Sequence, residues 1–123
     1  MAKRILIVDD EPRYLRLLEA NLRTEGYEVV TAQDGMQAVS VFSDQPIDLV
    51  LMDVMMPKLD GFGVIESLRA DPELRNIPVI VISSKDLTPE ESKTLRESVA
   101  FVMKKQGFDG GRLIEEINSA VKK

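Results

Sequence analysis

Five short apolar runs recur along the chain, and longer segments with apolar residues at every third or fourth position separate them. The runs consist mostly of valine, isoleucine and leucine, and charged residues, proline or glycine flank them. Apolar runs of this length are typical of strands that are buried on both faces of a parallel sheet. The pattern therefore predicts five strands: Ile5 to Val8, Tyr27 to Ala32, Ile47 to Met52, Ile77 to Ile82, and Val99 to Met103.

The segments between the runs carry signals that begin and end helices. Pro12 suits a first helical position and Gly26 suits a helix end, which predicts a helix from Pro12 to Glu25. A capping box of Thr88 and Glu91 starts a helix that continues to about Glu97, and its few apolar residues predict that it is the least firmly held. Three more helices are predicted: one opened by Asp34-Gly35 and stopped by Pro46, one opened by Asp60-Gly61, and one after Phe108-Asp109-Gly110 that carries Leu113, Ile114, Ile117 and Val121 on one face.

Strand and helix alternate five times, and no linker, internal repeat or low-complexity tract interrupts them. With 123 residues the chain fits a single domain, residues 1–123, of the α/β class. We expect a flavodoxin-like, doubly wound, five-stranded parallel sheet in the order 2-1-3-4-5, with five helices on both faces. In such a sheet ligands bind at the carboxyl ends of the strands where the winding direction reverses, here between the first and third strands.

Composition narrows the chemistry that this domain can perform. The chain has no cysteine and no histidine, which excludes thiolate nucleophiles, disulfides and the commonest zinc ligands. The net charge of −5, from 16 basic and 21 acidic residues, gives no electrostatic support for direct binding to nucleic acid. Neither a membrane-spanning run nor a signal peptide is present in the sequence, so we expect a soluble, cytoplasmic protein with no membrane partner.

Polar residues stand where four of the predicted strands end. Asp9 and Asp10 follow the first strand, Asp53 follows the third, Ser83 the fourth and Lys104 the fifth. Because adjacent strands lie about 4.8 Å apart, the three carboxylates become near neighbours, and two of them about 5 Å apart repel by roughly 3 kcal/mol. A hard divalent cation such as Mg²⁺ takes oxygen ligands and relieves that repulsion. The pattern therefore predicts a Mg²⁺ site at this edge of the sheet.

The same edge suits phosphoryl transfer. Asp53 is the candidate nucleophile, since a carboxylate is ionised at neutral pH and requires no base. Lys104 offers a positive charge, and Ser83 offers a hydroxyl donor, to the oxygens of a phosphoryl group. Plain structural explanations exist beside these: Asp10 and Glu11 can cap a helix, Ser83 can be a turn residue and Lys104 a solvated charge. The joint placement of these residues at successive strand ends favours the functional interpretation.

Four segments resemble the receiver domain of two-component response regulators, and the resemblance spans essentially the whole chain. They are ILIVDDE at 5–11, DVMMPKLDGFG at 53–63, PVIVISS at 78–84 and the pair Phe101-x-x-Lys104. The resemblance implies that Asp53 accepts a phosphoryl group from a phosphohistidine on a sensor histidine kinase or a phosphotransfer protein. It also implies that Asp10 and Asp53 bind Mg²⁺ directly, that Asp9 acts through water, and that the backbone carbonyl of Met55 completes the protein ligands.

The resemblance further implies a conformational switch. Ser83 would move toward the phosphoryl group, Phe101 would follow it inward, and Lys104 would pair with the phosphoryl oxygens. The surface of the fourth helix, the fifth strand and the fifth helix would then report the change to a downstream effector protein or domain. Apart from the resemblance, Phe101 can also be explained as an aromatic core residue.

The sequence departs from the family pattern directly after the fifth strand, where Lys105 stands in place of the usual proline. The sequence therefore offers two adjacent candidates, Lys104 and Lys105, for the lysine that points into the acidic pocket. We expect Lys104 to point inward, because it keeps the family spacing from Phe101 and because side-chain alternation places it with Ala100 and Val102 on one face of the strand.

Two other functions stay open beside the phosphorylated switch. A pseudo-receiver would keep the fold and bind its partner constitutively. A small Mg²⁺-dependent phosphatase would also use an aspartate nucleophile, but that chemistry generally needs a second acid two residues further on, where this chain has Met55. We therefore expect a switch that phosphorylates and dephosphorylates itself, not an enzyme with turnover.

Overall fold

A computed structural model describes residues 2–53, 61–83, 87–105 and 109–121 of the chain. Strands and helices alternate along these residues, as the apolar pattern predicts. The elements are β1 (Arg4–Val8), α1 (Pro12–Thr24), β2 (Glu28–Ala32), α2 (Gly35–Asp44), β3 (Leu49–Met52), α3 (Gly61–Ala70), β4 (Val79–Ser83), α4 (Pro89–Ser98), β5 (Phe101–Lys104) and α5 (Gly110–Val121).

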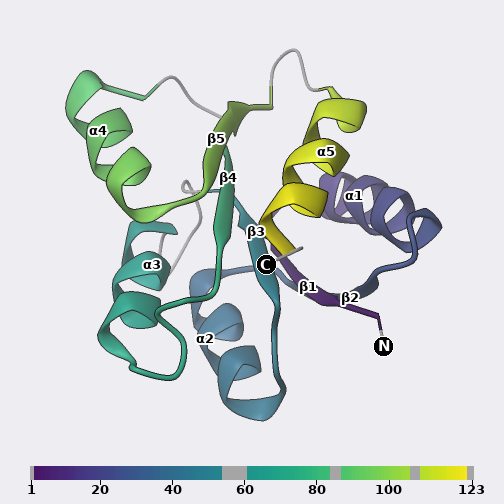
Figure 1. Cartoon of the computed structure of the whole chain (residues 1–123), viewed down its shortest axis with the longest axis horizontal. Coiled ribbons are helices and arrows are strands. Elements are labelled where there is room, and N and C mark those ends of the chain that lie inside the picture. Colours follow the sequence, from purple (N-terminus) through teal and green to yellow (C-terminus); the bar gives the residue numbers. More distant parts are fainter. Residues whose placement is uncertain (1, 54–60, 84–86, 106–108, 122–123) are drawn as a thin grey trace.

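The strands form one parallel sheet in the order β2-β1-β3-β4-β5. Figure 1 shows the sheet nearly edge-on, with α1 and α5 covering one face and α2, α3 and α4 covering the other. The predicted flavodoxin-like fold, its strand order and its helices on both faces are therefore confirmed. Crossovers of this kind bring the carboxyl ends of all the strands to one edge.

Each face of the sheet packs against its own helices. On the α1/α5 face, Ile5 and Ile7 of β1 pack with Leu18 of α1 and Ile117 of α5. On the opposite face, Leu6 and Val8 of the same strand belong to a second cluster that includes buried residues of α2, α3 and α4. Helices cover both faces of the sheet, which explains why the strands are apolar at successive positions instead of alternating between apolar and polar residues. These alternate positions also decide which side chains meet beyond the strand ends.

The predicted helix signals are present in the structure. Gly26, directly after the end of α1, has φ of 92°, a left-handed conformation that glycine adopts without strain. The Asp34 carboxylate caps α2 by accepting from the Gln37 amide at 2.9 Å. Thr88 and Glu91 form the predicted capping box of α4.

The structure places the starts of four strands later than predicted, of which β2 begins at Glu28 rather than Tyr27 and β3 at Leu49 rather than Ile47. β5 begins at Phe101, not at Val99, because the Val99 amide donates to the Leu95 carbonyl at 2.8 Å and so ends α4. β4 begins at Val79, later than predicted, since Pro78 has no amide hydrogen to donate to a neighbouring strand. Asp60 and Phe108 lie outside the described residues, but α3 begins at Gly61 and α5 at Gly110 as predicted. The Asp109 carboxylate accepts from the Arg112 backbone amide at 3.1 Å at the start of α5.

Candidate functional site

Three aspartates gather at the carboxyl edge of the sheet. Asp9 follows β1 and is 2% exposed, Asp53 follows β3 and is 1% exposed, and Asp10 is exposed. One carboxylate oxygen from each lies within 4.8 Å of the other two, and no other such group of three acidic residues occurs in the described part of the chain. The predicted convergence of the three acids is thus present, and their oxygens suit a hard divalent cation.

Backbone pairing places Asp9 and Asp53 side by side. Val8 of β1 pairs with Met52 of β3, and the Asp53 amide donates to the Val8 carbonyl at 3.1 Å. The Asp9 amide donates to the carbonyl of Ala32 in β2 at 3.1 Å. Each aspartate therefore continues the backbone pairing of its strand by one hydrogen bond. These bonds fix the backbone positions from which the two buried side chains extend.

A lysine enters this pocket, but it is not the predicted one. The Lys105 ammonium lies 2.7 Å from Asp9 Oδ2 and 3.1 Å from Asp53 Oδ2, with Glu11 Oε1 3.8 Å away. Its side chain is 14% exposed. The expectation that Lys104 points into the acidic pocket is therefore wrong, and Lys105 occupies that place.

Lys104 lies on the opposite face of β5 instead. Its side chain is exposed and lines a cavity of about 330 Å³ beside α4, together with Ser83 and Arg96.

Side-chain alternation explains this placement. Phe101 and Met103 pack on the α1/α5 face of β5, so the next residue on that face is Lys105. Asp9 and Asp53 continue the same face, because Ile5 and Ile7 precede the first and Leu49 and Leu51 precede the second in register. The sequence thus carries the signal for Lys105, but only when alternation is applied to all three strands together rather than to the fifth alone.

Burial and charge oppose each other in the pocket. Burial raises the pKa of Asp9 above its ordinary value, although the Lys105 ammonium and the Glu11 amide counteract it. Burial lowers the pKa of Lys105, but its pairing with Asp9 and Asp53 outweighs burial and raises that pKa overall. Both Asp9 oxygens are engaged, since Oδ1 accepts from the Glu11 amide at 2.9 Å and Oδ2 pairs with Lys105.

Tyr14, in the first turn of α1, is a further member of the site that no sequence motif indicates. The centre of its ring lies 4.5 Å from the Lys105 ammonium nitrogen. Burial, followed by the charges of Asp9 and Asp53, raises the pKa of the Tyr14 hydroxyl, which keeps it neutral. In the sequence, Tyr14 is indistinguishable from a plain apolar position of an amphipathic helix.

Ser83 lies beside Lys105 at the carboxyl end of its strand, whereas Phe101 is the first residue of β5. Ser83 ends β4, is 2% exposed, and its carbonyl accepts from the Lys105 amide at 2.8 Å. Phe101 is half-buried, and the Arg112 guanidinium of α5 lies 5.3 Å from the centre of its ring. The movement expected of both residues stays a prediction, and Met55 lies outside the described residues.

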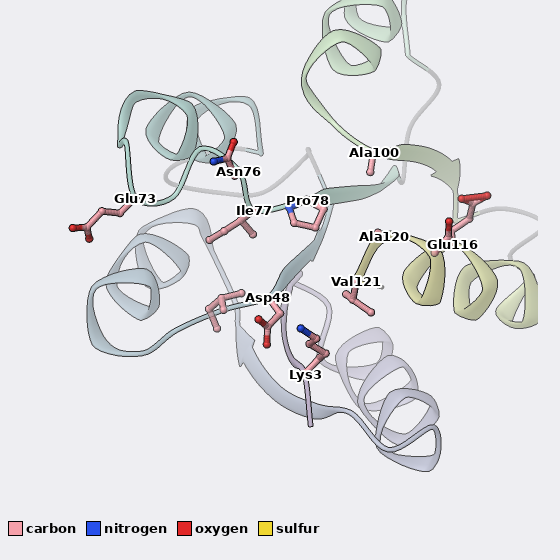
Figure 2. A pocket seen from close by; sticks show the side chains of 12 residues that line it. Lys3, Asp48, Glu73, Asn76, Ile77, Pro78, Ala100, Glu116, Ala120 and Val121 are labelled. Atoms are coloured by element: carbon pink, nitrogen blue, oxygen red, sulfur yellow. The ribbon is translucent and has the colours of Figure 1, made fainter. Parts of the chain in front are cut away.

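A cavity of about 670 Å³ lies at the other edge of the sheet. Figure 2 shows Lys3, Asp48, Pro78 and Ala100 around it, residues that stand directly before β1, β3, β4 and β5. The Asp48 carboxylate accepts from the Arg4 amide at 2.7 Å. The acidic pocket and this cavity therefore occupy opposite ends of the strands.

Across the described residues, no helix has both the length and the apolar character needed to cross a bilayer.

One family model matches nearly the whole chain. Residues 5–118 match the model of the family described as response regulator receiver domain. The response regulator PleD of Caulobacter vibrioides is 49% identical over 86 residues, which cover 70% of this chain and 19% of PleD. The chain thus spans only about a fifth of the length of that relative.

Solved structures share the fold. The receiver domain of sensor histidine kinase PA1611 from Pseudomonas aeruginosa PAO1 is 29% identical with a TM-score of 0.88 over the full length of both chains, and its structure has a magnesium ion coordinated in the active site cleft. The signal receiver domain of a signal transduction histidine kinase from Syntrophus aciditrophicus is also 29% identical, with a TM-score of 0.88, over 98% of this chain and 90% of that one.

Proposed function

The chain belongs to the response regulator receiver domain family of two-component signalling, and we propose that it is a switch which accepts a phosphoryl group on Asp53. The observation that carries the proposal is the pocket itself: a buried carboxylate at a strand end, beside two more carboxylates and one ammonium. The donor would be a phosphohistidine on a sensor histidine kinase or a phosphotransfer protein, and the place of action would be the cytoplasm.

The reaction needs few groups from the protein. A carboxylate oxygen of Asp53 forms a bond to phosphorus while the bond from phosphorus to the imidazole nitrogen of the donor breaks. The electron pair of that bond returns to the imidazole, which takes up a proton. No general base is required, which agrees with a chain that contains no histidine.

Mg²⁺ is the cation that we propose for this pocket, since carboxylates and a phosphoryl group are the ligands it commonly takes. Asp10 and Asp53 would bind it directly, with the Met55 carbonyl as a further ligand. Both oxygens of Asp9 are already engaged within the chain, which supports a role for Asp9 through water. When bound, the cation neutralises charge that builds up on the transferred phosphoryl oxygens.

Lys105 takes the role first expected of Lys104. Its ammonium already lies beside Asp53, so it can pair with an oxygen of the phosphoryl group placed there. Ser83 would donate its hydroxyl to another oxygen, and Phe101 would then move inward. The surface of α4, β5 and α5 would carry the change to an effector protein or domain. The domain would phosphorylate and dephosphorylate itself without acting as a turnover enzyme.

The proposal is tested with the purified chain, Mg²⁺ and a small acyl phosphate as donor. Intact mass measurement should find one added phosphoryl group, and the adduct should be lost in Asp53→Asn and on removal of Mg²⁺. The matched control is Asp44→Asn, an exposed acid at the end of α2. If a saturating donor leaves the wild-type mass unchanged, the phosphorylated switch is wrong and a constitutive binding module becomes the better explanation.

A further inference from the structure

We infer that Tyr14 is a positioning residue whose ring holds the Lys105 ammonium against Asp9 and Asp53, and that it thereby makes Lys105 the lysine that meets the phosphoryl group. The inference deepens the proposed function and rests on it. The receiver motifs of this chain assign no role to Tyr14, and its ring reaches the site through its contact with Lys105.

Among the described residues, two kinds of group surround the Lys105 ammonium. Carboxylate oxygens of Asp9, Asp53 and Glu11 lie 2.7, 3.1 and 3.8 Å from its nitrogen. The other group is the face of the Tyr14 ring, with its centre 4.5 Å from the same nitrogen. An aromatic face attracts an ammonium more when water is excluded, and the Lys105 side chain is only 14% exposed.

The backbone at the end of β5 does not by itself fix the position of the Lys105 ammonium. The strand ends at Lys104, and the Lys105 amide continues the pairing with a hydrogen bond to the Ser83 carbonyl. That bond sets the face on which the Lys105 side chain begins, but four flexible carbons separate the backbone from the ammonium. A rigid partner on the α1/α5 face, in addition to the carboxylates of Asp9 and Asp53, would narrow the positions that the ammonium can take.

Tyr14 is fixed in the way that such a partner requires. Its amide donates to the Glu11 carbonyl at 3.1 Å in the first turn of α1. Its side chain packs against the core on the α1/α5 face, which includes Leu15 and Leu18 from the same helix. The ring is thus a rigid surface beside a flexible side chain, and it stands next to the acids that follow β1.

The arrangement predicts effects of opposite sign on two measurable quantities. A firmly held Lys105 competes with Mg²⁺ for oxygens of Asp9 and Asp53, so it weakens Mg²⁺ binding. The same ammonium speeds phosphorylation, because it meets the negative charge that arrives at Asp53. Loss of the ring should therefore slow phosphorylation and tighten Mg²⁺ binding, whereas a general loosening of the pocket would weaken both.

The test compares Tyr14→Leu with Tyr14→Phe, each alone and combined with Lys105→Ala. Phosphorylation by a small acyl phosphate is followed by intact mass, and Mg²⁺ affinity by calorimetry. We expect Tyr14→Leu to slow phosphorylation by roughly 3- to 30-fold and to tighten Mg²⁺ binding. Tyr14→Phe, which keeps the ring and removes only the hydroxyl, should match the wild type. In the Lys105→Ala background, Tyr14→Leu should change neither quantity.

Weaker Mg²⁺ binding in Tyr14→Leu would overturn the inference, as would a failure of the phenylalanine variant to match the wild type. An undiminished effect of Tyr14→Leu in the Lys105→Ala background would overturn it too, because Tyr14 would then act independently of the lysine. If the wild type takes up no phosphoryl group, the proposed function fails, while the Mg²⁺ titrations still decide whether Tyr14 acts through Lys105.

Discussion

Lys105 brings a positive charge to two buried carboxylates, whereas its neighbour Lys104 points to the side of α4. The two lysines have the same charge and adjacent positions, so they form a matched pair for substitution. We predict that Lys105→Ala slows phosphorylation by an acyl phosphate on the order of 100-fold, the usual cost of removing one group that stabilises transferred charge. Lys104→Ala should leave the rate within about twofold, since its ammonium is not in the pocket.

Initial rates from intact mass spectra, taken at saturating Mg²⁺, provide the measurement. Mg²⁺ affinity is the second readout, and it should rise in Lys105→Ala only, because a competing cation has been removed from the Asp9 and Asp53 oxygens. A larger loss of rate in Lys104→Ala than in Lys105→Ala would contradict the assignment, and it would favour the spacing from Phe101 over the observed geometry.

Among the helices, α4 has the weakest attachment to the core. Leu95 is the buried side chain among those described in this helix, and the remainder are exposed or half-buried. Its start depends on the capping box, in which Thr88 accepts from the Glu91 amide at 3.1 Å and Glu91 accepts from the Thr88 amide at 3.0 Å. A helix with little buried surface relies more on its cap than a well-packed helix does.

We therefore predict that Thr88→Ala destabilises α4 by about 1 kcal/mol and speeds amide hydrogen exchange in that helix. Asp34→Ala, which removes the cap of α2, is the matched control. Because α2 buries Ala38 and Phe42, its loss should appear in global unfolding rather than in local exchange. Equal exchange in α4 of the wild type and of Thr88→Ala would show that packing at Leu95, not the cap, holds this helix.

The elements themselves were largely predictable, and the misplacements have local causes. Apolar runs indicate the strands because both faces of the sheet are buried, and cap residues indicate most helix ends. The start of β5 was not predictable, since Val99 suits a strand but its amide serves as the last donor of α4. The positions of the acids were predictable because they follow strand ends. The roles of Lys105 and Tyr14 were harder to predict, because they depend on which face of the sheet each side chain occupies.

In the domain as a whole, the candidate functional groups lie on both faces of one sheet. Asp9, Asp53 and Lys105 belong to the α1/α5 side, while Ser83 and Lys104 line the cavity next to α4. The hydrogen bond from the Lys105 amide to the Ser83 carbonyl joins the two groups across β4 and β5. We therefore expect a charge added to Asp53 to affect the α4 side through these strand ends.

In the metal-free domain, the buried Asp9 carboxylate should carry a free-energy penalty that depends on pH. The folded-state pKa of Asp9 is raised above its ordinary value of 3.8, chiefly by burial, so the charged form is less favourable in the folded than in the unfolded chain. The penalty is complete above the folded-state pKa. It is relieved as pH falls through that pKa toward 3.8, because the folded protein then takes up a proton first.

We predict that Asp9→Asn is more stable than the wild type in chelator at neutral pH, and that the difference shrinks as the solution is acidified into that window. Bound Mg²⁺ should reverse the order: a cation at one hundred times its Kd stabilises the wild type by about 2.7 kcal/mol, and the variant should gain less. Urea unfolding with and without Mg²⁺ measures both effects, with Asp44→Asn as the control for net charge. A variant less stable than the wild type in chelator would mean that the ion pair from Asp9 to Lys105 outweighs the burial of the carboxylate.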